Sequence, residues 1–156
     1  MNPAYIDRLL QALKDQDESV RNQATGEFWH MWFHQKGIQG AKRLIESQTL
    51  VEAERNKEAR TILDELILTQ PDFAEAWNRR AVLNYVQGDY FDAINDCEKV
   101  LKLVPHHFGA LHGLGLCHAS VGNYRDAIQY FRRTLDIQPF SMINQRLILE
   151  CITKLN

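Results

Sequence analysis

Residues of several types recur in this chain at a fixed interval of 34 positions. Three prolines mark the interval, at Pro71, Pro105 and Pro139. The same spacing relates other residues of matching type: Ala59, Ala93 and Ala127; Ile67, Leu101 and Leu135; and the turns Gly88-Asp89-Tyr90 and Gly122-Asn123-Tyr124. One residue type can match by chance, but several types in the same register indicate an internal structural repeat. The chain is therefore predicted to stack similar units that each contact mainly their neighbours.

The unit at residues 74–107 has the pattern of a helical hairpin. Its first segment is apolar at a helical spacing, at Ala74, Trp77, Ala81 and Tyr85. Gly88 tolerates a positive φ between the segments, and a second helix is predicted from about Tyr90 to Leu103. Pro105 ends the unit, because proline disfavours helix at the residue before it and donates no backbone hydrogen bond. The unit at residues 108–141 follows the same plan.

These units resemble the tetratricopeptide-repeat (TPR) family. The family pattern is Trp-x-x-Leu-Gly-x-x-Tyr, then Ala-x-x-x-Phe, then Pro. The matching residues are Trp77, Ala81, Ala93 and Pro105 in one unit, and Leu111, Leu114, Gly115, Ala127, Phe131 and Pro139 in the next. The resemblance implies a single all-α domain, a right-handed superhelical solenoid of antiparallel helix pairs.

Several positions depart from the family pattern. Arg80 occupies the leucine position of one unit, and Asn84 and His118 occupy the tyrosine positions. Residues 40–73 are interpreted as a degenerate TPR unit, because their turn, Glu54-Arg55-Asn56-Lys57, contains no glycine. The alternative is one longer, bent helix through residues 41–69.

The segment before the repeats, residues 1–38, is predicted to be a helical hairpin from its periodicity alone. Its second helix carries an aromatic run from Phe28 to Phe33, in which Phe28 and Trp32 lie one helical turn apart. We interpret this aromatic face as a plug that seals the first repeat. The alternative is an exposed aromatic anchor for a partner.

After Ser141, residues 142–156 are predicted to form a last helix that caps the third hairpin. Its predicted buried stripe is Ile143, Leu147, Ile148, Cys151, Ile152 and Leu155. Met142 and Leu149 fall outside this stripe. They are interpreted as scattered surface residues, with a homodimer contact as the alternative.

The resemblance implies a non-enzymatic interaction scaffold, in which the first helices of successive hairpins line a concave groove for a peptide or protein partner. The candidate groove residues are Gln48, Asn78, Arg79, Val82, Tyr85, His112 and Leu116. Apolar residues around a central Arg79 would suit a partner with apolar side chains and an acidic group. The N-terminal hairpin or the last helix could instead cover the apolar part of the groove.

The family's best-known groove chemistry is a two-carboxylate clamp for the acidic C-termini of chaperones, and this sequence does not predict it. Leu44 and Gln48 stand where the clamp needs lysine and asparagine, and Arg79 stands where it needs a second asparagine. Gly109 and Gly113 stand where it needs lysine and arginine.

Other functions find little support in the sequence. The net charge of −2 gives no reason to expect nucleic acid or an anionic membrane as a partner. No phosphate loop or catalytic motif appears, so no cofactor or enzymatic activity is expected. His30 and His34 have a spacing that can chelate a metal, which leaves a metal-binding protein as the least favoured alternative.

Two further features concern the location of the protein. Charged Asp7 and Arg8 interrupt the apolar core that a signal peptide needs, and no stretch is apolar enough to insert in a membrane. Cys97, Cys117 and Cys151 are scattered without a CxxC pair, as expected for reduced thiols. A cytoplasmic location is therefore expected.

Overall fold

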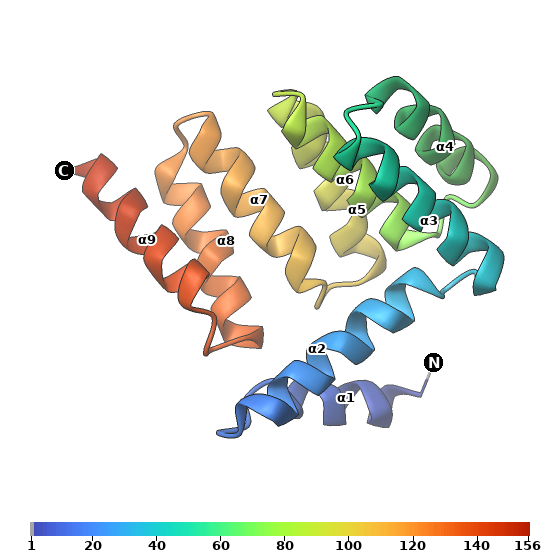
Figure 1. The fold of residues 1–156 in the computed structure, drawn as a ribbon. Helices are drawn as coiled ribbons and strands as arrows, with labels where there is room; N and C mark the ends of the chain where they lie inside the picture. Colours follow the sequence, from blue (N-terminus) through green and yellow to red (C-terminus); the bar gives the residue numbers. More distant parts are fainter. Residues whose placement is uncertain (1) are drawn as a thin grey trace.

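A computed structural model describes residues 2–156, and the regular elements within them are nine α-helices (Figure 1). The helices are α1 (Pro3–Ala12), α2 (Glu18–Phe33), α3 (Gly37–Glu52), α4 (Asn56–Thr69), α5 (Ala74–Val86), α6 (Tyr90–Leu103), α7 (Phe108–Ser120), α8 (Tyr124–Ile137) and α9 (Met142–Leu155). The predicted all-α solenoid is confirmed. None of the helices described is long and apolar enough to cross a membrane.

Three hairpins stack in sequence order, α3–α4, α5–α6 and α7–α8, and α9 packs against α8. The turns inside the second and third hairpins require left-handed backbone, with φ of 79° at Gly88 and 84° at Gly122. The first hairpin has the same kind of break without a glycine, because Glu54 adopts a φ of 60°. Residues 41–69 are thus two helices rather than one bent helix.

Close helix packing explains the glycine of the third hairpin. A Cβ atom added at Gly115 would lie 2.3 Å from the Phe131 ring of α8, well inside van der Waals contact. Ala81 occupies the equivalent position of α5 and is also buried. The small residues of the repeat pattern therefore permit the two helices of each hairpin to approach.

The departures Arg80 and Asn84 belong to one polar network between α5 and α6. Arg80 donates two hydrogen bonds to the Asp96 carboxylate, at 2.9 and 2.8 Å. The Asn84 amide donates to the same carboxylate at 3.0 Å. From the preceding hairpin, Arg60 donates to Asn84 at 2.7 Å, and Asp64 accepts from Arg80 at 3.1 Å. Polar contacts thus replace the apolar contacts that the family pattern would place between these helices.

The α1–α2 hairpin lies along the edge of the solenoid, below the row of repeat helices (Figure 1). Phe28 and Trp32 are buried in a cluster with Phe108, at the start of α7. At the two ends of α2, Lys36 pairs with Asp72 at 2.7 Å, and the Arg21 guanidinium lies 4.1 Å from the centre of the Phe140 ring. The hairpin therefore contacts the three connections that contain Pro71, Pro105 and Pro139.

The interpretation of the aromatic face as a plug for the first repeat is therefore wrong for Phe28 and Trp32, whereas Phe33 does pack against the core of the first unit. The aromatic side chains find a deeper apolar site at Phe108 of the third unit, where Phe28 meets the Phe108 ring edge-on at 5.8 Å. At the surface of the first unit, Arg43 of α3 pairs with Glu46 at 2.8 Å and with Glu65 of α4 at 3.4 Å.

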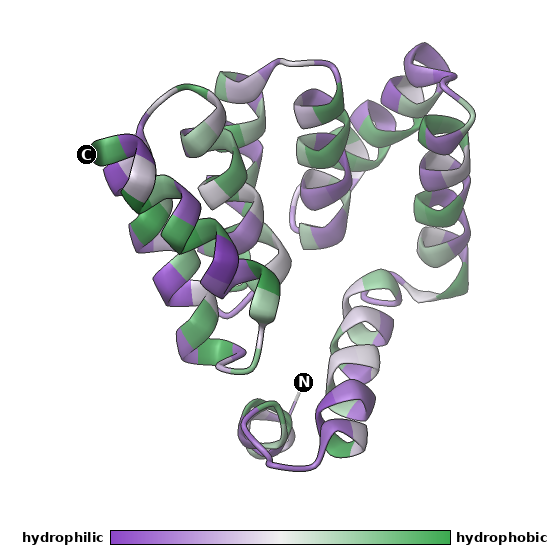
Figure 2. Ribbon diagram, turned by 60° about the vertical axis from the view of Figure 1, so that its left-hand side comes forward, coloured by the Kyte–Doolittle hydropathy of each residue, from purple (hydrophilic) through white to green (hydrophobic). Residues whose placement is uncertain are grey.

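The last helix is only partly covered. Cys151 is buried, and Leu147 and Ile148 are half-buried against α8. The exposed apolar side chains of α9 are Met142 (80%), Ile143 (49%), Leu149 (64%), Ile152 (36%) and Leu155 (45%). Hydrophobic residues accordingly appear along the outside of α9 in Figure 2. The predicted burial of Ile143, Ile152 and Leu155 is wrong, because no helix packs on that side of α9 within residues 2–156.

Candidate functional site

Three of the predicted groove residues meet in one hollow between α3 and α5. Gln48, Arg79 and Val82 line a space of about 160 Å³. The rest of its lining is Ser47, Val51, Glu52 and Leu63. Val82 is 39% exposed and Gln48 is also exposed, so a partner can reach both. This hollow combines apolar surface with one guanidinium.

Arg79 is held in a defined orientation at the edge of this hollow. Its Nε atom donates to the Glu75 carboxylate at 3.0 Å. Its guanidinium carbon lies 5.7 Å from the Trp29 ring and 5.5 Å from the Phe33 ring of α2, distances at which cation–π attraction is significant. Within residues 2–156, its terminal nitrogens donate no hydrogen bond. The side chain is therefore pre-oriented with donors left for a ligand.

Glu75 supports Arg79 from a fully buried position. Its carboxylate also accepts hydrogen bonds from His107 Nε2 at 2.8 Å and from Asn78 at 3.0 Å. Burial alone would raise the pKa of Glu75, but the hydrogen bond from His107 and the charge of Arg79 bring it below its ordinary value. The buried carboxylate is therefore ionised at neutral pH.

His107 joins this network to the aromatic cluster. Its Nδ1 atom accepts from the backbone N–H of Ala110 at 3.0 Å, which caps α7 and leaves the ring proton on Nε2. Its ring stacks on Trp32 with 3.9 Å between centroids. This role of Glu75 and His107 is not evident from the sequence, because an acid in the first turn of a helix is ordinarily a surface residue that favours the helix dipole.

The remaining predicted groove residues lie apart from the hollow. Asn78 is buried and donates to the Glu75 carboxylate, and Tyr85 is half-buried against Tyr90. On α7, His112 shares a 2.8 Å hydrogen bond with Asn144 of α9, and Leu116 is half-buried in the α7–α9 cluster. These contacts place His112 and Leu116 at the other end of the row of first helices.

The chain covers part of its own groove. A Cβ atom added at Gly109 would lie 2.7 Å from Trp29, so α2 lies directly on the start of α7. Asn144 of α9 engages His112 farther along. Of the two alternatives, cover by the chain itself therefore applies to the start of α7, while the hollow between α3 and α5 stays open.

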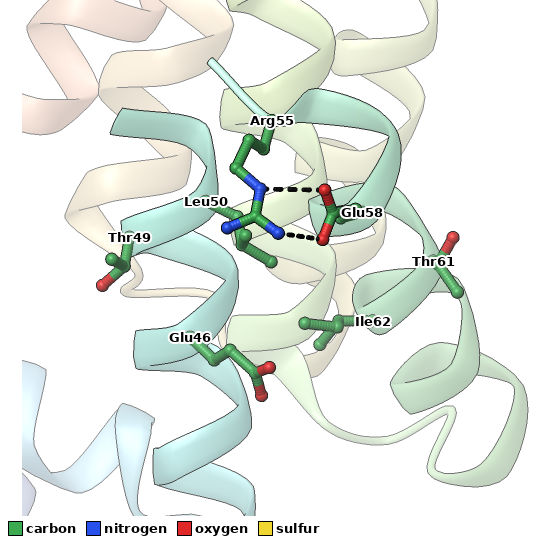
Figure 3. Close-up of a pocket in the computed structure, with 7 residues that line it drawn as sticks. All are labelled: Glu46, Thr49, Leu50, Arg55, Glu58, Thr61 and Ile62. Carbon is green, nitrogen blue, oxygen red and sulfur yellow. Dashed lines mark hydrogen bonds and ion pairs between the residues drawn. The ribbon is translucent and has the colours of Figure 1, made fainter. Parts of the chain in front are cut away.

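A larger, shallower hollow of about 630 Å³ lies between α3 and α4 at the outer end of the first unit (Figure 3). Leu50 and Ile62 lie at its base, and charged or hydroxyl side chains surround them. Arg55 and Glu58 on its rim pair with each other at 2.6 Å. Its charges are already neutralised, so it offers a partner less than the α3–α5 hollow does.

Neither the histidines nor the cysteines form a reactive group among the described residues. His30 and His34 stack with 4.0 Å between ring centroids, and no cluster of three metal-ligating side chains exists in residues 2–156. Burial raises the pKa of Cys97, and it raises that of Cys117 to about 11. Both thiols are therefore protonated at neutral pH.

Comparison with known proteins supports the repeat architecture. A family model described as tetratricopeptide repeat matches residues 72–139. A TPR repeat-containing protein of Rhizobium etli is 34% identical over 135 residues, which are 86% of this chain and 66% of that protein. The chain belongs to the tetratricopeptide-repeat family. Protein SGT1 homolog of Bos taurus is 32% identical over 97 residues, 60% of the TPR chain but only 28% of that protein.

The TPR chain therefore spans less than two thirds of the length of these relatives. Among solved structures, the first TPR of Spaghetti (RPAP3), bound to an HSP90 peptide, has a TM-score of 0.70 over 72% of this chain and 90% of its own, at 14% identity. MamA has a TM-score of 0.67 over 89% of this chain and 85% of its own, at 19% identity. At these identities, the likeness establishes the fold.

Proposed function

We propose that the TPR chain is a non-enzymatic scaffold that binds a peptide or protein partner on the surface formed by α3 and α5. The general role as an interaction scaffold rests on the family, whose members are protein-interaction scaffolds. The placement rests on the α3–α5 hollow, where oriented Arg79 adjoins exposed Val82. Because the cysteines are unpaired, the cytoplasm is the proposed location.

The proposed partner presents apolar side chains to this surface, with one acidic group for Arg79. An acidic chaperone tail is not the partner we propose. The HSP90 peptide bound to RPAP3, SRMEEVD, ends in a strongly acidic segment. Arg79 is the one cation that lines the α3–α5 hollow, and Glu52 lies on its edge. Such a peptide would meet too few positive charges.

Affinity purification with mass spectrometry, using the wild-type chain and Val82→Asp as baits, tests the placement. We expect Val82→Asp to lose specific partners, because a charge would be buried at the contact. Leu68→Asp is the matched control, since Leu68 is 83% exposed on α4, outside the hollow. Capture that survives Val82→Asp, with circular dichroism unchanged, contradicts the placement.

A second experiment tests the exclusion of an acidic chaperone tail. Titration of the chain into fluorescently labelled SRMEEVD peptide should give no saturable rise in fluorescence anisotropy.

A second candidate function is self-association through α9. The observation that favours it is the row of exposed apolar side chains on α9, of which Met142 and Leu149 are the most exposed. We expect a weak dimer, because two helix faces bury less area than the roughly 1,000 Å² of a stable interface. Sedimentation velocity at micromolar concentration tests this. A dimer that dissociates in Leu149→Asp but not in Leu68→Asp supports the idea, and a strict monomer rules it out.

A further inference from the structure

A separate hollow of about 450 Å³ lies where the α1–α2 hairpin meets the connection between α6 and α7. We call it the hairpin pocket. Its lining is Pro3, Ile6, Asp7, Met31, Trp32, Gln35, Leu103, Val104, Pro105 and His106. It exists because the hairpin lies on the edge of the solenoid, so the repeat pattern does not predict it. Its volume falls within the range of small-molecule sites.

The walls of the hairpin pocket are mostly apolar. Ile6 comes from α1, Met31 and Trp32 come from α2, and Val104 comes from the end of the second repeat unit. All four also belong to the aromatic cluster around Phe108 or pack against it. Because Trp32 is held between that cluster and the stacked His107 ring, this wall is rigid. A preformed apolar wall favours binding of an apolar molecule.

Few polar groups in the hairpin pocket remain for a ligand. The Gln35 amide is already used, since it donates to the Asp72 carbonyl at 2.8 Å and accepts from the Ala74 N–H at 3.1 Å. Asp7 and His106 form no hydrogen bond or ion pair within residues 2–156. The Trp32 indole N–H also donates no hydrogen bond within the described residues. Asp7, His106 and this N–H are therefore the side-chain polar groups that can orient a ligand.

The charge of the hairpin pocket comes from Asp7. Burial lowers the pKa of His106, and the adjacent His107 lowers it further, so the His106 ring is neutral at neutral pH. No lysine or arginine lines the pocket. An anionic ligand would face the Asp7 carboxylate without a counter-charge, whereas a cation would be attracted to it.

We propose that the hairpin pocket binds a small apolar amine, an alkyl or aryl body with one ammonium group. The apolar body contacts Ile6, Met31 and Trp32, and the ammonium group lies beside Asp7. The neutral His106 ring can accept a further hydrogen bond from the ammonium group. This site shares no lining residue with the partner surface on α3 and α5.

The test compares three probes with the same carbon chain, hexylamine, 1-hexanol and hexanoate, by NMR titration of the amide signals of residues that line the pocket. We expect hexylamine to bind with a millimolar dissociation constant, about threefold to fivefold more tightly than 1-hexanol. Hexanoate should bind most weakly. In Asp7→Asn, hexylamine and 1-hexanol should bind with equal affinity. In Asp7→Lys, hexanoate should bind more tightly than the other two probes.

Asp136→Asn is the matched control, since Asp136 is an exposed and unpaired acid within the described chain, on α8 and outside the pocket. It should leave the order of the three probes unchanged. The proposal is overturned if hexanoate binds the wild-type chain as tightly as hexylamine. It is also overturned if Asp136→Asn weakens hexylamine as much as Asp7→Asn does, or if no probe shifts the pocket signals at about 10 mM.

Discussion

Arg80, Asn84 and Asp96 show how a departure from the repeat pattern can be a matched set. Asp96 is 4% exposed, and it receives hydrogen bonds from both other residues. The pKa of Arg80 is raised, first by its hydrogen bond to Asp96, so its charge is retained. Arg80 or Asp96 alone would be unfavourable between two helices, because a buried charge needs its partner.

Replacing Arg80 by leucine, the family residue, should therefore destabilise this chain. We expect Arg80→Leu to lower the free energy of unfolding by about 3 kcal/mol, because it leaves the Asp96 carboxylate buried and unpaired. The double variant Arg80→Leu, Asp96→Leu should recover part of this loss. Urea denaturation of the single and double variants measures both values. The coupling between Arg80 and Asp96 would be contradicted if the double variant lost as much free energy of unfolding as Arg80→Leu and Asp96→Leu lose when added together.

Glu75 contributes stability that depends on pH. Its pKa is lowered in the folded chain relative to the ordinary value of 4.5, because His107 and Arg79 favour the carboxylate more than burial opposes it. The contribution is therefore complete above the unfolded pKa, and it is lost as the pH falls through the folded pKa.

The variant Glu75→Gln should lack this pH-dependent contribution to stability. At pH 7 we expect an unfolding free energy about 2 kcal/mol below that of the wild type, because the charged hydrogen bonds are weakened. The difference should shrink as the pH falls below about 4.5. Chemical denaturation at several pH values measures it, with the exposed Glu46→Gln as control. A difference that stays constant down to pH 3 would exclude the assigned role.

At the scale of helices, one small residue decides how closely two helices approach. Gly115 and Ala81 occupy this position on α7 and α5, and each is followed by a second helix packed against it. The same position of α9, one repeat later, is Leu149, which is 64% exposed. A leucine there would hold a second helix farther from α9 than α6 lies from α5.

Gly115→Ala should destabilise the third hairpin although alanine favours helix. The added Cβ would meet the Phe131 ring at 2.3 Å, which forces α7 and α8 apart. We expect a net loss of about 1–2 kcal/mol by thermal or urea unfolding. Gly26→Ala on α2 is the matched control, because its Cβ would meet nothing within 4 Å. It should stabilise the chain by about 0.5–1 kcal/mol, and similar effects at both glycines would exclude the packing argument.

At the scale of the whole molecule, the N-terminal hairpin connects repeat units that are distant in sequence. Phe28 packs on Phe108, while Arg21 lies over Phe140 of the next connection. Its contacts run along one edge, so it can open without unfolding α8 and α9. The hairpin thereby supports both the oriented Arg79 and the hairpin pocket.

Phe28→Ala should loosen this hairpin selectively. We expect faster amide hydrogen exchange in α1, α2 and the connection between α6 and α7, because the cavity left by a fully buried phenylalanine weakens the docking cluster. Exchange in α8 and α9 should change little. Mass spectrometry of exchanged peptides measures the pattern, with Phe91→Ala as the control because Phe91 is 70% exposed on α6. Uniform acceleration along the whole chain would contradict local opening.

The local elements of this protein follow from its sequence, because helix periodicity and turn residues act between neighbours along the chain. The 34-residue interval predicts the hairpins, and Gly88 and Gly122 predict their turns. It also predicts the row of first helices that provides Gln48, Arg79 and Val82 for the candidate site. These features need only contacts within one unit or between adjacent units.

Only the tertiary structure decided the site of the aromatic hairpin, the burial of Glu75 and the pairing of Arg80 with Asp96. The aromatic hairpin depends on a contact between segments far apart in sequence, Phe28 with Phe108. Glu75–His107 and Arg80–Asp96 pair within the unit at residues 74–107, but at positions where the repeat pattern specifies no polar partner. No local pattern encodes such contacts, because an aromatic helical face can dock on any sufficiently apolar surface. The hydrophobic effect is non-directional, so the shape and polarity of the assembled repeats determined where that face is buried.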